Sequence, residues 1–197
     1  RRRQRQMCIR DRTGIGKACA AEMYSHGALV TICGRTEENL KQSVQEIVEN
    51  HQDGGVIQYV TCDVTDEEQV LETVLAADEF AEGLDGVVAN AGGGGAIVPY
   101  HMQTAEEFSR VLNLNVLGTM LCIKHAVPIL RKSDKASFVG MSSIASHLTH
   151  LWFGAYPAAK AGIEAIIRNA ADEYGPANIR FNAVRPGFIE TEIMEGI

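Results

Sequence analysis

Short apolar runs and longer segments of helical period alternate along this chain from residue 15 onward. Residues 28–33 form a continuous apolar run, as in strands that are buried on both faces. Further runs of strand length lie at 56–61, 84–89, 137–141 and 179–184, and segments of helical period lie at 15–26, 36–50, 65–77, 104–131 and 156–174. This alternation predicts βαβ units and a parallel sheet covered by helices.

The pattern predicts a single α/β domain with a doubly wound parallel sheet of the Rossmann type, whose ligands bind beyond the carboxyl ends of the strands. Two capping boxes predict helix starts, one at Thr65-Asp66-Glu67-Glu68 and one at Thr104-Ala105-Glu106-Glu107. Gly27 is predicted to end the first helix.

The charges and cysteines argue against several classes of partner. The 25 acidic and 18 basic side chains give a net charge of −7, yet six of the arginines lie in the first twelve residues. Residues 13–197 therefore hold 12 basic and 24 acidic groups, a net of −12, so we expect no nucleic-acid partner. There is no apolar run of about 18 residues and no secretory leader, so we expect a cytoplasmic protein without a membrane span. Five cysteines without a CxxC pair predict neither a disulfide framework nor a metal site.

Tyr156 and Lys160 lie four residues apart on a predicted helix, so both side chains project from one face. An ammonium near a phenol favours the phenolate, which makes a tyrosine usable as a general acid and base. Ser143 follows the end of a predicted strand, where its hydroxyl could orient a substrate oxygen. Alone, such a pair is also expected by chance on an ordinary amphipathic helix.

Four further motifs accompany the Tyr156-Pro157-Ala158-Ala159-Lys160 segment. They are Asn90-Ala91-Gly92, Asn115 within residues 113–118, Ser142-Ser143, and Arg185-Pro186-Gly187. In this order and spacing, residues 13–197 resemble the short-chain dehydrogenase/reductase family.

The resemblance implies an NAD(P)-dependent oxidoreductase that transfers a hydride between a nicotinamide cofactor and a carbonyl or alcohol substrate, as a homo-oligomer. Tyr156 would donate or accept the proton, Lys160 would assist it and hold the ribose, and Ser143 would orient the substrate. Asn115 would position a water that links Lys160 to solvent. The cofactor-binding residues would be Thr13, Gly14, Ile15, Gly16, Gly34, Arg35, Asp63, Val64, Asn90, Ala91, Gly92, Tyr156, Lys160, Pro186, Gly187, Ile189 and Thr191. The alternative is a dinucleotide-binding protein of the same fold without turnover.

The first twelve residues depart from the family pattern. Thr13-Gly14-Ile15-Gly16 matches the second half of the family's TGxxxGxG loop, but Ile9 and Arg10 stand where the first Thr-Gly is expected. An arginine-rich stretch replaces the apolar first strand. We therefore expect residues 1–12 to be a non-native head from sequencing or cloning, with residues 1–6 unstructured or poorly packed, and residues 13–197 to be a domain truncated at both ends.

The end of the second predicted strand bears on the cofactor. The strand ends Cys33-Gly34-Arg35, without the acid that usually binds the ribose 2′-hydroxyl of NAD. The guanidinium of Arg35 suits a 2′-phosphate instead, and Lys17 could add charge, so the sequence favours NADP(H) over NAD(H).

Several residues before Tyr156 have two possible roles. His147 and His150 could contact a ligand or be loop residues. Trp152 and Phe153 could line an apolar substrate pocket, or they could belong to the core or to a subunit contact.

Overall fold

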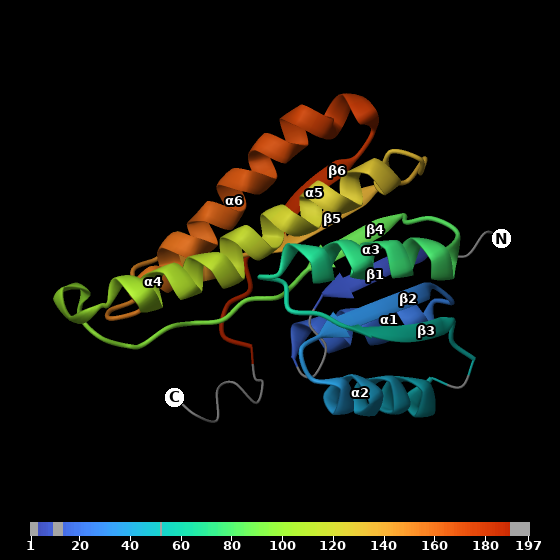
Figure 1. The fold of residues 1–197 in the computed structure, drawn as a ribbon, viewed down its shortest axis with the longest axis horizontal. Coiled ribbons are helices and arrows are strands. Elements are labelled where there is room, and N and C mark those ends of the chain that lie inside the picture. Colours follow the sequence, from blue (N-terminus) through green and yellow to red (C-terminus); the bar gives the residue numbers. More distant parts are fainter. Residues whose placement is uncertain (1–3, 10–13, 52, 190–197) are drawn as a thin grey trace.

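A computed structural model describes residues 4–9, 14–51 and 53–189 of the chain. Six parallel strands form one sheet in the order β3-β2-β1-β4-β5-β6 (Figure 1). The strands are β1 (Arg5–Ile9), β2 (Leu29–Gly34), β3 (Val56–Thr61), β4 (Gly86–Ala89), β5 (Ser137–Met141) and β6 (Arg180–Val184). The chain runs outward from β1 to β3, returns to the centre, and then runs outward from β4 to β6. This order confirms the doubly wound α/β fold.

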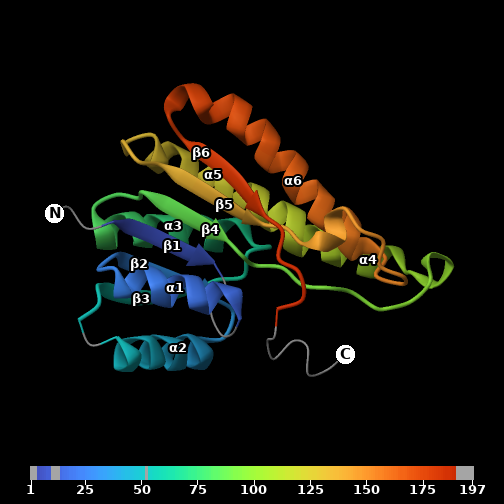
Figure 2. The same ribbon diagram turned by 180° about the vertical axis from the view of Figure 1, so that it is seen from behind.

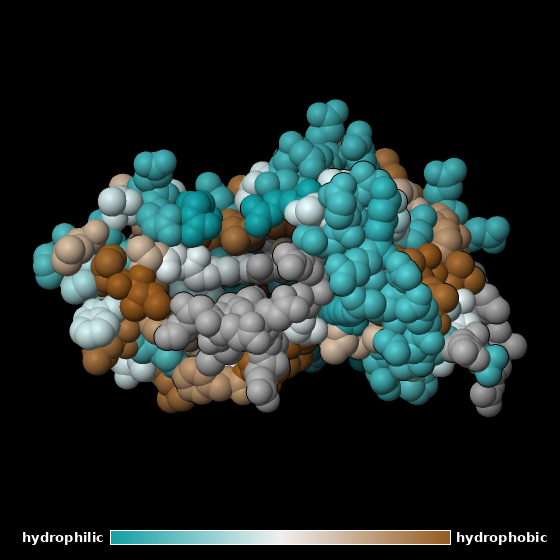
Figure 3. Space-filling model, turned by 90° about the horizontal axis from the view of Figure 1, so that it is seen from below, coloured by the Kyte–Doolittle hydropathy of each residue, from teal (hydrophilic) through white to brown (hydrophobic). Residues whose placement is uncertain are grey.

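Helices cover both faces of the sheet. They are α1 (Ile15–Ser25), α2 (Glu37–Asn50), α3 (Glu67–Ala81), α4 (Ala105–Leu112), α5 (Gly118–Leu130) and α6 (Ala155–Tyr174). Helices α1 and α2 pack against β1, β2 and β3 on one side, whereas α3, α5 and α6 pack on the other (Figures 1 and 2). The outer surface of α2 is hydrophilic (Figure 3).

Side chains of β2 point alternately to the two faces of the sheet and pack into two separate cores. Val30 and Ile32 join Leu40 and Ile47 beneath α1 and α2. Cys33 belongs to the larger cluster beneath α3, α5 and α6. Because successive side chains of a strand point to opposite faces, one apolar run supplies both cores.

One of the two predicted helix starts shifts by a residue. Thr104 caps α4, since its side chain accepts a hydrogen bond of 3.1 Å from the Glu107 amide. At α3, however, Asp66 and not Thr65 is the cap. The Asp66 carboxylate accepts from the amides of Glu68 at 3.0 Å and Gln69 at 3.2 Å, while the Thr65 hydroxyl lies outside the helix and donates to Asp63 at 2.8 Å.

The long helix predicted at 104–131 contains an irregular turn. A π-helical segment, η2 (Asn113–Leu117), separates α4 from α5. The run from Ala105 to Leu130 is long and apolar enough to cross a membrane, but α5 contributes nine buried residues to the interior. It has the character of a core helix.

The expectation that residues 1–6 are unstructured or poorly packed is wrong for Arg5 and Gln6, and residues 1–3 lie outside the described residues. Residues Arg5–Ile9 form the central strand β1, paired with β2 on one side and β4 on the other. Arg5 is only 7% exposed, but its guanidinium is not unpaired, because it binds the Asp85 carboxylate at 2.8 Å. Ser133 donates a further hydrogen bond of 2.7 Å to Asp85. Although burial opposes it, hydrogen bonds from Arg5 and Ser133 lower the pKa of Asp85. The foreign origin of residues 1–12 stays a prediction.

Candidate active site

A cavity of about 460 Å³ lies at the carboxyl ends of the central strands. Its wall comes from the start of α1, the loops after β4, β5 and β6, and the first turns of α6. The lining residues include Gly14, Ile15, Asn90, Gly92, Ile97, Ser143, Ile144, His150, Phe153, Tyr156, Lys160, Pro186, Gly187, Phe188 and Ile189. A ligand site at this edge is what a doubly wound sheet predicts.

Tyr156 and Lys160 share this cavity, one helical turn apart on α6. The Lys160 ammonium lies 5.4 Å from the centroid of the Tyr156 ring. It also donates a hydrogen bond of 2.9 Å to the carbonyl of Met141, at the end of β5. This bond fixes a buried positive charge near the Tyr156 ring.

Ser143 faces the same cavity from the loop after β5. Its hydroxyl accepts a hydrogen bond of 3.2 Å from the Ala145 amide, so the hydroxyl proton can be donated to a ligand. Strand β5 and helix α6 thus bring Ser143, Tyr156 and Lys160 together although 17 positions separate the first from the last.

Asn115 is fully buried in the π-helical segment and does not line the cavity. Its side-chain amide donates to the carbonyls of Gly93 at 2.9 Å and Val111 at 2.8 Å, and its oxygen accepts from the Gly93 amide at 3.3 Å. The side chain therefore holds the glycine-rich loop after β4. A Cβ at Gly92 would lie 2.5 Å from the Asn115 oxygen and 2.9 Å from the Lys160 nitrogen. The glycine-rich loop, the Asn115 amide and the Lys160 ammonium therefore lie close together.

Glu164, one turn beyond Lys160, was not identified from the sequence. It is 7% exposed, and one of its oxygens accepts hydrogen bonds from Ser142 at 2.7 Å, Ser146 at 2.5 Å and Arg185 at 2.6 Å. A second Arg185 nitrogen binds the other oxygen. The bonds from Arg185, against the effect of burial and with help from Ser146 and Ser142, lower the pKa of Glu164 to about 2. The residues that form hydrogen bonds with Glu164 are scattered in sequence, and no local motif indicates them.

The predicted cofactor residues divide into two groups. Gly14, Ile15, Asn90, Gly92, Tyr156, Lys160, Pro186, Gly187 and Ile189 line the cavity, whereas Gly16, Gly34, Arg35, Asp63, Val64 and Ala91 do not. Thr13 and Thr191 lie outside the described residues. Gly34 ends β2 and Asp63 follows β3, so these two lie at the same edge of the sheet as the cavity.

The start of α1 suits a phosphate group. Gly14 has a positive φ of 69°, which a glycine adopts without strain. The N-terminus of a helix carries backbone N–H groups and a partial positive charge that favour an anion. Lys17, expected to add charge there, instead forms an ion pair with Glu46 of α2, and Arg35 is exposed.

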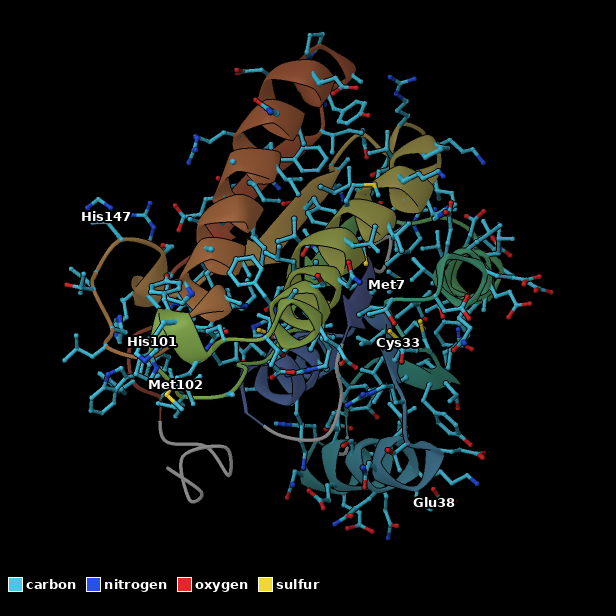
Figure 4. The ribbon with its side chains drawn as sticks, turned by 60° about the vertical axis from the view of Figure 1, so that its left-hand side comes forward. Met7, Cys33, Glu38, His101, Met102 and His147 are labelled. Atoms are coloured by element: carbon cyan, nitrogen blue, oxygen red, sulfur yellow. The ribbon has the colours of Figure 1, made fainter. Side chains whose placement is uncertain are left out.

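The structure separates the ambiguous residues before Tyr156. His150 and Phe153 line the cavity, while His147 is exposed and points away from the ribbon (Figure 4). Trp152 is 58% exposed and does not belong to the core. Apolar side chains gather at this end of the molecule (Figure 3), and the exposed ones include Ile97, Met102, Leu148, Leu151 and Phe188.

Comparisons with known proteins show which family the chain belongs to. A family model described as Enoyl-(Acyl carrier protein) reductase matches residues 9–197. Levodione reductase of Leifsonia aquatica is 33% identical over 183 residues, which are 93% of this chain and 68% of that protein. Cis-4-hydroxycyclohexanecarboxylate dehydrogenase of Sinomonas cyclohexanicum is 33% identical over 187 residues, 94% of this chain and 73% of that protein.

A solved structure is also similar to this chain. A short-chain type dehydrogenase/reductase from Mycobacterium ulcerans superimposes with a TM-score of 0.95 at 38% identity, covering 98% of this chain and 70% of that one. The chain therefore belongs to the short-chain dehydrogenase/reductase family, a family of oxidoreductases that use nicotinamide cofactors and act on alcohol or carbonyl groups.

Proposed function

We propose that this protein interconverts a cyclic ketone and the corresponding alcohol with NADP(H). The observation that carries the proposal is the placement of Ser143, Tyr156 and Lys160 around one cavity at the carboxyl edge of the sheet. The alternative, a dinucleotide-binding protein without turnover, is less well supported, because binding alone requires neither a phenol nor an ammonium beside it.

The start of α1 would hold the pyrophosphate, Asp63 would bind the adenine, and Lys160 would bind the nicotinamide ribose. Pro186 and Gly187 would close over the nicotinamide. When bound in its reduced form, the cofactor supplies a hydride to the carbonyl carbon.

Proton transfer falls to the residues of the chain. The Ser143 hydroxyl donates a hydrogen bond to the carbonyl oxygen and orients it. The Tyr156 hydroxyl donates its proton to the same oxygen as the hydride arrives, and the Lys160 ammonium stabilises the phenolate that remains. Asn115 supports a water that returns a proton toward Lys160.

Replacement of Tyr156 by phenylalanine tests the proposed reaction. Tyr156→Phe removes the transferable proton and keeps the ring, so kcat for a cyclic ketone with NADPH is expected to fall by about 10²–10⁴. NADPH affinity, measured by fluorescence titration, is expected to change little. Turnover within tenfold of the parent would exclude Tyr156 as the acid. Tight NADPH binding without reduction of any ketone in a broad panel, by the parent protein, would favour the binding alternative.

Cofactor choice depends on Arg35 in this proposal. A charge-assisted hydrogen bond to the 2′-phosphate is worth about 1.5–3 kcal/mol, so Arg35→Ala is expected to lower kcat/KM for NADPH by roughly ten- to a hundredfold. The value for NADH is expected to remain within about threefold. Arg180→Ala, which removes an exposed arginine of β6, is the matched control. Equal efficiency of the parent protein with both cofactors would contradict the NADP(H) assignment.

The proposed substrate class follows from the cavity wall. Ile97, Ile144, Phe153, Phe188 and Ile189 give it an apolar lining that suits a hydrocarbon ring. A relative with 33% identity is named for a hydroxycyclohexanecarboxylate, which is a cyclohexane ring with two oxygen-bearing groups. A ring ketone or ring alcohol is therefore the class to test first.

The proposed setting of the enzyme is the cytoplasm, and its proposed form is a homo-oligomer. The resemblance to the family supports the oligomer, and the acidic surface supports a protein without nucleic-acid partners.

A further inference from the structure

We infer that His150 binds a second oxygen group of the substrate, a hydroxyl across the ring from the reacting carbonyl. The inference rests on the proposed function and narrows its substrate class to hydroxylated ring ketones and the diols formed from them. Among the described residues that line the cavity, only Tyr156, Lys160 and His150 have side chains that titrate. The first two serve the reaction, so His150 is left to serve recognition.

Aromatic packing sets the position of His150. Its ring lies 5.5 Å from the ring of Phe153, tilted by 58°, and 6.5 Å from the ring of Phe188. Phe153 lies in turn 6.3 Å from Tyr156. The wall of the cavity thus runs from a polar group at Tyr156, over an apolar ring, to a second polar group at His150. A substrate with an apolar ring between two oxygens matches this order of groups.

A hydrogen bond determines which kind of group His150 can bind. Its Nδ1 lies 3.0 Å from the backbone carbonyl of Leu148. A carbonyl oxygen only accepts, so Nδ1 carries the proton, and Nε2 of the neutral imidazole is an acceptor. Among the residues that the structure describes, none forms a hydrogen bond with Nε2. An acceptor requires a donor, and a hydroxyl supplies one, whereas a second ketone does not.

His147 offers a matched comparison. It lies on the same loop, three positions before His150, but it is exposed and outside the lining of the cavity (Figure 4). Two single variants, in which one or the other histidine is replaced by the same residue, therefore separate an effect in the cavity from an effect on the loop surface.

The experiment compares 4-hydroxycyclohexanone with cyclohexanone as substrates of the full chain with NADPH, at about pH 8, where an ordinary imidazole is neutral. We expect kcat/KM to favour the hydroxylated ketone by about tenfold, as one hydrogen bond provides. In His150→Phe this ratio is expected to fall to about one, and His150→Gln, which retains a side-chain acceptor, is expected to restore part of it. In His147→Phe the ratio is expected to equal that of the parent.

A binding measurement covers the case of slow turnover. Titration with 1,4-cyclohexanediol is expected to shift the Nε2 resonance of His150 in ¹⁵N NMR, and cyclohexanol is expected not to shift it. The inference would be overturned if the parent had equal kcat/KM for both ketones, or if His150→Phe kept the preference for the hydroxylated ketone. It would also be overturned if the diol did not shift the Nε2 resonance. A stronger preference for 4-oxocyclohexanecarboxylate would also overturn it, because it would identify an imidazolium that binds an anion. If neither ketone is reduced and the diol still shifts Nε2, the proposed function fails and the binding role of His150 stands.

Discussion

At the scale of single residues, Gly92 occupies the most restricted position in the site. A Cβ added at Gly92 would lie within 3 Å of both the Asn115 side-chain oxygen and the Lys160 nitrogen, so there is no room for one. The family motif Asn90-Ala91-Gly92 has a steric reason here, since any side chain at its third position would displace the group that assists Tyr156.

Gly92→Ala is expected to lower kcat by roughly a hundredfold, because a displacement of about 1 Å in a catalytic group has an effect of that size. Circular dichroism is expected to show an intact fold. Gly94→Ala is the control, since a Cβ at Gly94 would meet nothing within 4 Å. If the two variants have the same kcat within twofold, the steric argument is wrong.

At the scale of elements, Glu164 joins three segments that carry the site. It lies on α6 and binds Ser142 and Ser146, which flank Ser143, and Arg185, which precedes the Pro186-Gly187 turn after β6. The carboxylate thus fixes the loops after β5 and β6 to the helix that presents Tyr156.

Glu164 is expected to make folding depend on pH between about 4.5 and about 2. Its folded pKa of about 2 lies below its ordinary value of 4.5, so its contribution is present above pH 4.5 and is lost as the pH falls toward 2. At neutral pH that contribution is at most about 3 kcal/mol. Urea unfolding from pH 6 to pH 3 is expected to show the difference between the parent and Glu164→Gln shrinking as the pH falls.

Asp172→Asn serves as the control for this measurement. Asp172 is exposed on the same helix, so its variant is expected to follow the pH dependence of the parent. A constant difference between the parent and Glu164→Gln over the whole range would show that Glu164 is not an ionised, bonded group in the folded protein.

At the scale of the whole molecule, β1 holds the two halves of the sheet together. It pairs with β2 on one side and with β4 on the other, so its backbone joins the two halves of the sheet. Met7, in the middle of the strand, is fully buried in the larger core. Arg5, the first residue of the strand, binds Asp85.

Met7→Ala is expected to lower the free energy of unfolding by about 2–5 kcal/mol, as for other large-to-small changes in a core. Met102→Ala is the control, because Met102 is 60% exposed at the far end of the molecule and its loss is expected to change stability by less than about 0.5 kcal/mol (Figure 4). Both values are measured by urea unfolding. Similar, small losses in the two variants would mean that residues 5–9 do not form the central strand in solution.

The sequence by itself determined the class of fold and indicated many of the residues that line the cavity. Strands buried on both faces and amphipathic helices differ in their apolar period, and this period is a local property that can be read along the chain. Tyr156 and Lys160 are also local, since one helical turn separates them. Ser143 was indicated by its position after a predicted strand, because parallel strands end at one edge of the sheet, whereas Asn90 and Pro186 were expected from the resemblance to the family.

The tertiary structure alone decided which charges are paired and which side chains face the cavity. Arg5 belongs to the segment expected to be unstructured or poorly packed, yet Asp85, 80 positions away, binds its guanidinium inside the fold. Glu164 obtains its partners from three segments, and η2 turns Asn115 toward the glycine loop and not toward the cavity. His147 and His150 are indistinguishable in sequence, and only the packing against Phe153 and Phe188 places one of them in the site. Arg5 with Asp85, Glu164 with Arg185, Asn115 with Gly93 and His150 with Phe188 are contacts between residues that are distant in sequence, and no spacing along the chain encodes such a contact.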